Sequence, residues 1–71
     1  MNETVMNRIR DFRSKLELTQ KDLAKLSGVS RQSINSIEKG KYIPSLPLAL
    51  KLAKIFNCKV DELFVLTETD K

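Results

Sequence analysis

Histidine and tryptophan are absent from this 71-residue chain, and cysteine occurs once, at Cys58. A single cysteine cannot form an intramolecular disulfide, and the lack of histidine removes the commonest nitrogen ligand of zinc. The composition therefore predicts a protein of the reducing cytoplasm that has no metal site and no cofactor. Cys58 is expected to be a small apolar filler, because no histidine is present to activate its thiol.

Long apolar runs are also missing. No segment approaches the roughly 18 to 20 consecutive apolar residues of a transmembrane helix. The N-terminal stretch "MNETVMNRIRDF" mixes acids and bases without the apolar core of a signal peptide. We therefore expect no membrane partner.

The chain offers little to catalysis. Asp61 and Glu62 are adjacent, so on a helix their side chains diverge rather than meet at one substrate, and there is no glycine-rich phosphate loop. The sequence predicts that the protein is not an enzyme.

Positive charge is present in excess and is unevenly distributed. Residues 1–57 hold eleven Lys and Arg against five acids, whereas residues 58–71 hold two against four. A small basic body that contains few aromatic residues favours a polyanionic partner such as nucleic acid.

Apolar residues recur at helical spacing in the first part of the chain. One helical stripe at i, i+4, i+7 and i+11 is formed by Val5, Ile9, Phe12 and Leu16. Asn7 can cap the start of this helix, which is expected to end at "ELT", residues 17–19.

A second helix is marked at both ends. Thr19 and Asp22 in "TQKDLAKLSG" have the spacing of a capping box, and Gly28 is a natural left-handed stop. The pattern predicts a short helix over residues 20–27.

A third helix follows after only "GVS". Ser30 can cap it, Ile34 and Ile37 form its buried side, and Gly40 ends it. Two short helices joined by a turn of about three to four residues that contains glycine form a helix-turn-helix, here over about residues 20–39.

The outward positions of this third helix are unusual for a surface that faces only water. Ser and Asn are mediocre helix formers, so Lys, Glu and Ala would be favoured there. The residues found instead are Arg31, Gln32, Ser33, Asn35 and Ser36. Short hydrogen-bonding side chains at these positions suggest a partner with donors and acceptors.

The C-terminal half continues the helical pattern. Ser45 can cap a fourth helix after the proline-containing loop, and "KVDELF" is a final short helix. "VLTE" has the character of a brief strand that could pair with "ETVM" near the N-terminus. We therefore predict one domain over residues 1–71, an all-α five-helix bundle with a possible short two-stranded sheet.

The segment "LTQKDLAKLSGVSRQSINSIEKGKYIPSLPLALKLAKIF" resembles the phage-repressor and Cro type of helix-turn-helix, the xenobiotic-response-element (XRE) family. The motifs "TQ", "LA" and "GVS", together with Ile34, Ile37, Glu38 and Gly40, stand in the family's register. The resemblance implies a sequence-specific transcriptional regulator that binds double-stranded DNA, with residues 31–39 in the major groove.

The resemblance also implies a role for individual residues. The base contacts would be Arg31, Gln32 and Ser36, with Ser33 and Asn35 nearby as base or phosphate contacts. The phosphate contacts would be Gln20, Ser30, Lys39, Lys41 and Tyr42. An ion pair between Arg13 and Glu38 would join the first helix to the third.

A homodimer that acts as a repressor on an inverted-repeat operator is the expected working unit. The resemblance places its interface at Ile43, Val60 and Phe64, mainly in residues 58–67. Lys59 departs from the family pattern, in which a Ser or Thr often caps the fifth helix. Two alternatives stay open: an antitoxin that binds both DNA and a toxin protein, and a protein-interaction module.

Overall fold

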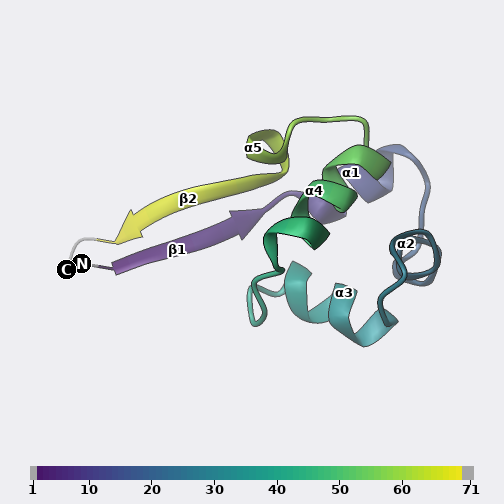
Figure 1. The fold of residues 1–71 in the computed structure, drawn as a ribbon, viewed down its shortest axis with the longest axis horizontal. Coiled ribbons are helices and arrows are strands. Elements are labelled where there is room, and N and C mark those ends of the chain that lie inside the picture. Colours follow the sequence, from purple (N-terminus) through teal and green to yellow (C-terminus); the bar gives the residue numbers. More distant parts are fainter. Residues whose placement is uncertain (1, 70–71) are drawn as a thin grey trace.

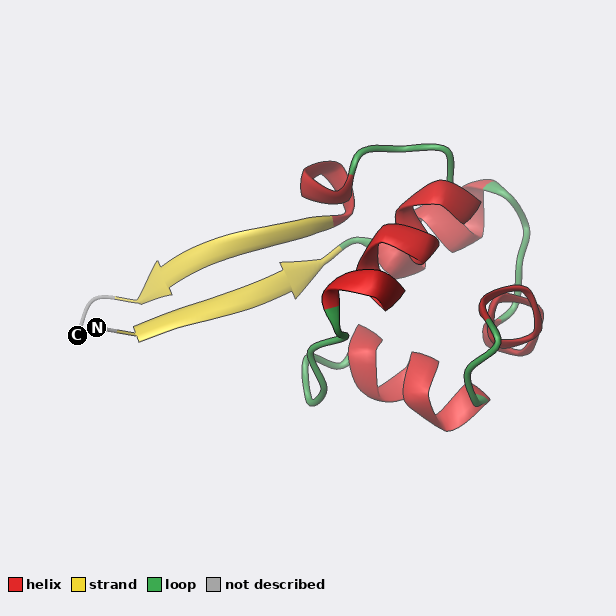
Figure 2. Cartoon of the chain, viewed as in Figure 1, coloured by secondary structure: helices red, strands yellow, loops and turns green. Residues whose placement is uncertain are grey.

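The structure, a computed structural model, describes residues 2–69. Within this range the chain forms β1 (Asn2–Asn7), α1 (Ile9–Lys15), α2 (Gln20–Ser27), α3 (Arg31–Glu38), α4 (Leu46–Ile55), α5 (Val60–Leu63) and β2 (Phe64–Thr69). The helices form one body, and the two strands extend from it as a ribbon (Figure 1). Figure 2 shows the same division between a helical part and a strand part. The predicted class, a five-helix fold with a small sheet, is confirmed.

The capping box at the start of α2 is confirmed. The Asp22 backbone N–H donates to Thr19 Oγ1 at 3.0 Å, and the Thr19 N–H donates to Asp22 Oδ2 at 2.9 Å. Hydrogen bonds to the carboxyl from the Thr19 backbone N–H and the Thr19 side chain lower the pKa of Asp22, with a further contribution from two nearby lysines. Gly28 ends the helix at φ 81°, a left-handed conformation that favours glycine.

The signals for α3 and α4 are also confirmed. The Ser33 N–H donates to Ser30 Oγ at 3.0 Å, and Leu48 N–H donates to Ser45 Oγ at 3.4 Å, so both serines cap their helices. Gly40 has φ 76° just past α3. Because these features mark both of its ends, α3 has a defined length.

The prediction that Val5 belongs to the stripe of the first helix is wrong, and the predicted ends of this helix differ from the observed ones by about two residues. Val5 lies in β1, because residues 2–7 pair with β2 and their backbone groups take part in a sheet. The helix begins at Ile9 with Arg8 as its cap residue, and Asn7 Oδ1 accepts from the Ile9 N–H at 3.2 Å. It ends at Lys15, just before the predicted "ELT", because the chain turns at Glu17, whose φ is 57°.

The predicted strand pairing is confirmed, and both strands are longer than expected. The sheet is antiparallel, with Val5 opposite Leu66 and Met6 opposite Val65. At its inner end Asn7 joins the ribbon to α3, since Asn7 Nδ2 donates to the Ile37 carbonyl at 2.8 Å. That carbonyl lies in the last turn of α3 and also accepts from the Gly40 N–H at 3.0 Å.

The core lies where the five helices meet. Its fully buried large side chains are Ile9, Leu23, Ile34, Ile37, Leu52 and Leu63. At α5 the missing side-chain cap at Lys59 is offset by Glu62, whose Oε1 accepts from the Lys59 N–H at 2.7 Å. None of the helices within residues 2–69 is long and apolar enough to cross a bilayer.

Candidate nucleic-acid interface

Helix α3 turns its apolar side inward and its polar side outward. Ile34 and Ile37 are buried in the core, which fixes the helix rotation. Arg31 and Gln32 are exposed in the first turn, and the three remaining predicted readers are half-buried: Ser33, Asn35 and Ser36. The structure therefore brings these five side chains onto the outer part of one short, capped helix.

One surface depression joins α3 to the loop that follows it. It is lined by Ser30, Gln32, Ser33, Ser36 and Tyr42. Tyr42 thus lies beside the polar side chains of α3. The Ser30 hydroxyl already has two partners within the protein, because it donates to Ser33 Oγ at 3.0 Å and accepts from the Ser33 N–H as the cap of α3.

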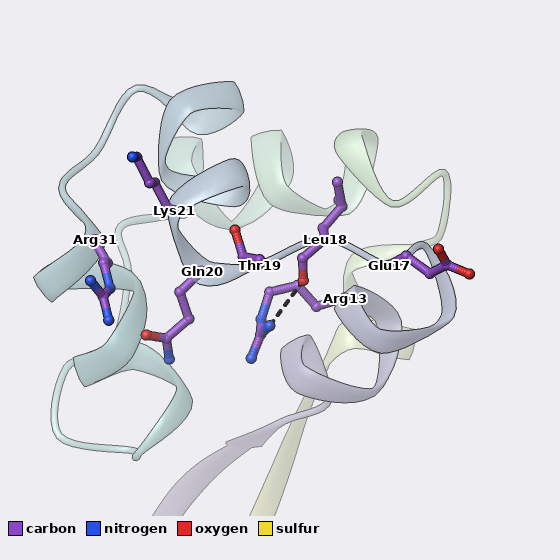
Figure 3. Close-up of a pocket in the computed structure, with 7 residues that line it drawn as sticks. All are labelled: Arg13, Glu17, Leu18, Thr19, Gln20, Lys21 and Arg31. Atoms are coloured by element: carbon purple, nitrogen blue, oxygen red, sulfur yellow. Dashed lines mark hydrogen bonds between the residues drawn. The ribbon is translucent and has the colours of Figure 1, made fainter.

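A second depression lies between α2 and α3. It is lined by Gln20, Arg31, Gln32 and Asn35. In Figure 3, Gln20 extends from α2 on the same side as Arg31 from α3. The N-terminal end of α2 and the predicted base-reading side chains therefore share one surface.

A third depression extends this surface to α1. It is lined by Arg10, Arg13, Gln20, Asn35, Glu38 and Lys39. Arg10 was missed by the sequence reasoning, although it precedes Arg13 by three residues and helical neighbours at that spacing lie on the same side. Arg10 and Lys39 are both exposed, so they add positive charge to the edge of the surface.

Arg13 and Glu38 form an ion pair across this depression. Arg13 Nε lies 2.8 Å from Glu38 Oε2, and Arg13 Nη2 donates to Oε1 at 3.2 Å. The side chains are only 15% and 8% exposed. Arg13 Nη1 also donates to the Leu18 carbonyl at 2.9 Å, the dashed line in Figure 3. One guanidinium therefore holds α1, the loop before α2, and α3 together.

Gln20 is placed differently from the simple expectation of a phosphate-binding side chain. Its Nε2 donates to Asn35 Oδ1 at 3.1 Å and to Glu38 Oε1 at 3.2 Å. An amide NH₂ has two hydrogens, so both are used inside the protein. The backbone N–H groups of Gln20 and Lys21, in the first turn of α2, have no intrahelical acceptor and carry the positive end of the helix dipole.

Lys41 stands apart from the three depressions. Its side chain is exposed, and its backbone N–H donates to the Ser36 carbonyl at 2.9 Å. This bond holds the start of the loop against the end of α3. Lys41 therefore lies near the surface that the three depressions form, but it lines none of them.

Several apolar side chains of the C-terminal part remain partly or largely exposed, although Val60 and Phe64 also pack against the core. Val60 and Phe64 are half-buried, and Ile43 is 60% exposed. Two exposed leucines of α4 were missed by the sequence reasoning: Leu46 at 67% and Leu50 at 51%. Their i, i+4 spacing, which puts them on one side of α4, was a readable signal.

Cys58 is half-buried against the core. Burial raises the pKa of its thiol, and the charge of Glu62 raises it further. A thiol with a raised pKa is a poor nucleophile, which agrees with the predicted role as an apolar filler.

Two short helices across a glycine turn, with the second one polar on its outer side, define a helix-turn-helix protein. The family model HTH_3, described as Helix-turn-helix, matches residues 9–63. A relative from Methanocaldococcus jannaschii is 54% identical over 59 residues, which cover 83% of this chain and 89% of its own. A relative from Archaeoglobus fulgidus is 49% identical over 63 residues, 89% of each chain. Both are named uncharacterized HTH-type transcriptional regulators.

Solved structures agree with the family assignment. The restriction-modification controller protein C.AhdI from Aeromonas hydrophila superposes with a TM-score of 0.71 at 35% identity, over 76% of this chain and 82% of that chain. The chain belongs to the XRE-type helix-turn-helix family, HTH_3. It is a transcriptional regulator with a helix-turn-helix DNA-binding domain, and the family is a DNA-binding class without enzymatic activity.

Proposed function

We propose that this regulator is a homodimeric repressor that reads an inverted-repeat operator with α3 in the major groove. The observation that carries the proposal is that α3 is amphipathic. Its outer side has five hydrogen-bonding side chains, and its opposite, apolar side is buried in the core. Base edges in the major groove present donors and acceptors in patterns that such side chains can distinguish.

Base reading is assigned first to Arg31 and Gln32. Both are exposed in the first turn of α3, the part of a recognition helix that contacts base edges. Arginine suits the O6 and N7 acceptors of guanine, and glutamine suits the N6 and N7 of adenine. The half-buried residues Ser33, Asn35 and Ser36 lie in the adjoining depressions and complete the reading surface.

Phosphate contacts surround this reading surface. Lys39, Lys41 and Tyr42 follow along the end of α3 and the next loop, and Arg10 adds a cation from α1. Gln20 contributes through its backbone N–H, because its side-chain donors are occupied. Ser30 binds through its backbone for the same reason. These contacts fix the orientation of α3 on the duplex and supply sequence-independent affinity.

Dimerisation supplies the second half of the recognition. One α3 touches only a few base pairs, so regulators of this kind double their contacts through two-fold symmetry. We assign the interface to Ile43, Val60 and Phe64, within the loop and residues 58–67, and extend it to Leu46 and Leu50. Repression is expected where the operator overlaps a promoter, because a bound dimer then excludes polymerase from the same DNA.

DNA binding is tested by fluorescence anisotropy, first with a labelled pool of duplexes and then with a preferred site from that pool. The wild type should bind, and Arg31→Ala should lose about fivefold or more in affinity for a preferred site. Lys25→Ala is the matched control, because Lys25 is an exposed cation of α2 outside the three depressions. Equal losses for the two variants would contradict the assignment of α3 as the reading helix.

The dimer is tested by sedimentation at micromolar concentration with circular dichroism alongside. The wild type should sediment as a dimer, and Val60→Asp should give a folded monomer, because a carboxylate placed in an apolar interface has no partner. Leu26→Asp, at an exposed leucine of α2 outside the assigned interface, is the control and should remain dimeric. A monomeric wild type, or a Val60→Asp protein that stays dimeric, would overturn this interface.

A further inference from the structure

Four side chains form a continuous hydrogen-bonded series from α1 to the reading surface of α3. Arg13 donates to both oxygens of Glu38, at 2.8 and 3.2 Å. Gln20 Nε2 donates to Glu38 Oε1 at 3.2 Å and to Asn35 Oδ1 at 3.1 Å. The series therefore starts at a largely buried ion pair and ends at one of the residues assigned to DNA.

The series fixes which end of each amide points inward. Glu38, paired with a guanidinium, is an ionised carboxylate and only accepts hydrogen bonds. The Gln20 atom beside it must therefore be the NH₂ group. The same NH₂ group faces Asn35, so the Asn35 atom at this contact must be the acceptor, Oδ1.

This arrangement leaves Asn35 with a donor to offer. Its Oδ1 is engaged by Gln20, whereas its Nδ2 makes no hydrogen bond to any residue that the structure describes. Asn35 is half-buried and lines the depression shared with Arg31 and Gln32, the two exposed residues assigned to base reading. The group of the Asn35 amide that has no partner among the described residues is therefore its NH₂ donor.

We infer that Gln20 is a specificity-determining positioning residue: it holds Asn35 as a donor, so the base that Asn35 meets must present an acceptor. Guanine O6 and N7, adenine N7 and thymine O4 satisfy this requirement in the major groove, whereas the cytosine amino group does not. The Asn35 oxygen has a second lone pair, so the bidentate pairing with adenine, whose N7 accepts and whose N6–H donates, satisfies the same requirement. The inference rests on the proposed DNA-binding function.

The same geometry separates Gln20 from a plain phosphate contact. A residue that only contacts the DNA phosphate backbone changes the affinity for all DNA sequences equally. A residue that orients a base reader changes the preference at one base position and leaves the other positions as they were. The readout is therefore the sequence preference rather than the affinity alone.

The experiment selects bound sequences from random DNA with the full chain and two variants. Asn35→Asp keeps an oxygen toward Gln20 and replaces the outward NH₂ by a second oxygen. Its preference at one position should change from an acceptor base toward cytosine, by about fivefold to tenfold. That position is thereby identified as the base opposite Asn35.

Gln20→Ala is the decisive variant. Without Gln20 the Asn35 amide is free to present either end, so discrimination at that same position should fall by about fivefold while the other positions keep their preferences. Lys21→Ala, an exposed neighbour in the same turn, is the control and should leave the preference unchanged. Melting curves confirm that each variant is folded.

The outcomes separate the inference from the proposed function. A wild type that selects a defined site, with Gln20→Ala lowering affinity uniformly and leaving every preference intact, would overturn the positioning role and keep the DNA-binding function. A wild type that enriches no sequence would overturn both. If Asn35→Asp alters no position, Asn35 is not a base reader and the inference fails by itself.

Discussion

Replacing Glu38 by alanine should destabilise the protein far more than the loss of an exposed charge. Glu38 is 8% exposed, and it accepts two hydrogen bonds from Arg13 and one from Gln20. Its removal leaves the Arg13 guanidinium, itself 15% exposed, without a counter-charge. Breaking one partner of a buried pair costs about 3 to 5 kcal/mol.

The lower end of that range is expected here. Arg13 keeps its hydrogen bond to the Leu18 carbonyl, and water can reach part of the guanidinium. A loss of about 3 kcal/mol in a domain of this size lowers the melting temperature by about 12 °C or more. The free energy of unfolding of a small domain is only about 5 kcal/mol or slightly more. The variant should therefore be close to unfolding at physiological temperature.

Urea unfolding followed by circular dichroism measures the effect. Asp11→Ala is the matched control, because Asp11 is an exposed carboxylate in the first turn of α1 and should contribute no more than about 1 kcal/mol. Glu38→Gln should fall between the two, since it keeps acceptor geometry but loses the charge. A Glu38→Ala loss no larger than that of Asp11→Ala would refute the reasoning that the pair locks α1 to α3.

Three further predictions follow from the surface and the caps. Lys41→Ala should weaken binding to all DNA sequences about equally and lower the slope of log affinity against log salt by about one unit; an unchanged slope would remove Lys41 from the phosphate contacts. Gln32→Ala should relax the preference at one or two base positions by about 1 to 3 kcal/mol while the fold persists, and a uniform loss across sequences would mark Gln32 as a backbone contact. The pKa of Asp22 is lowered in the fold from its ordinary value of 3.8, so its capping contribution is present above that value and is lost as the pH falls through the folded-state pKa. Urea unfolding at pH 6 and pH 2 should therefore show a smaller loss of stability for Asp22→Asn than for the wild type, and equal losses would mean that the carboxylate does not stabilise α2.

Local signals predicted the helix-turn-helix well. Thr19, Gly28 and Ser30 define helix ends through hydrogen bonds and backbone conformations that involve residues only a few positions away. Such features can be recognised in a sequence because the interacting groups are close together in the chain. The bounds of α2, 20–27, and the cap of α3 were accordingly predicted as they are observed.

For the start of the chain the sequence supported two competing predictions, a helical stripe that includes Val5 and a brief strand, "ETVM", that pairs with "VLTE". Val5 fits both a helical stripe with Ile9 and a strand that alternates inside and outside positions. The choice is decided by pairing with Leu66, a residue 61 positions further along the chain. The β-propensity of the two segments indicated the pairing, but no residue close to Val5 in the sequence decides between strand and helix.

The residues of the candidate site were largely predictable from the sequence, but the hydrogen bonds among them were not. The polar residues of α3 were readable from their helical positions, whereas the contact of Gln20 with Asn35 and Glu38 depends on the crossing of α2 and α3. The sequence therefore suggested Gln20 as a phosphate-binding side chain, and the structure gives its NH₂ group two acceptors inside the protein. Arg10 joins the site only because α1 packs beside the same surface.

Selection of wild-type-bound sequences from random DNA tests the central claim most directly. A two-fold dimer that places one α3 in each of two successive major grooves should enrich an inverted repeat whose half-site centres lie about 34 Å, one helical turn, apart. Enrichment of a single unrepeated half-site, or of no sequence above the starting pool, would contradict the account of a dimeric, sequence-specific repressor.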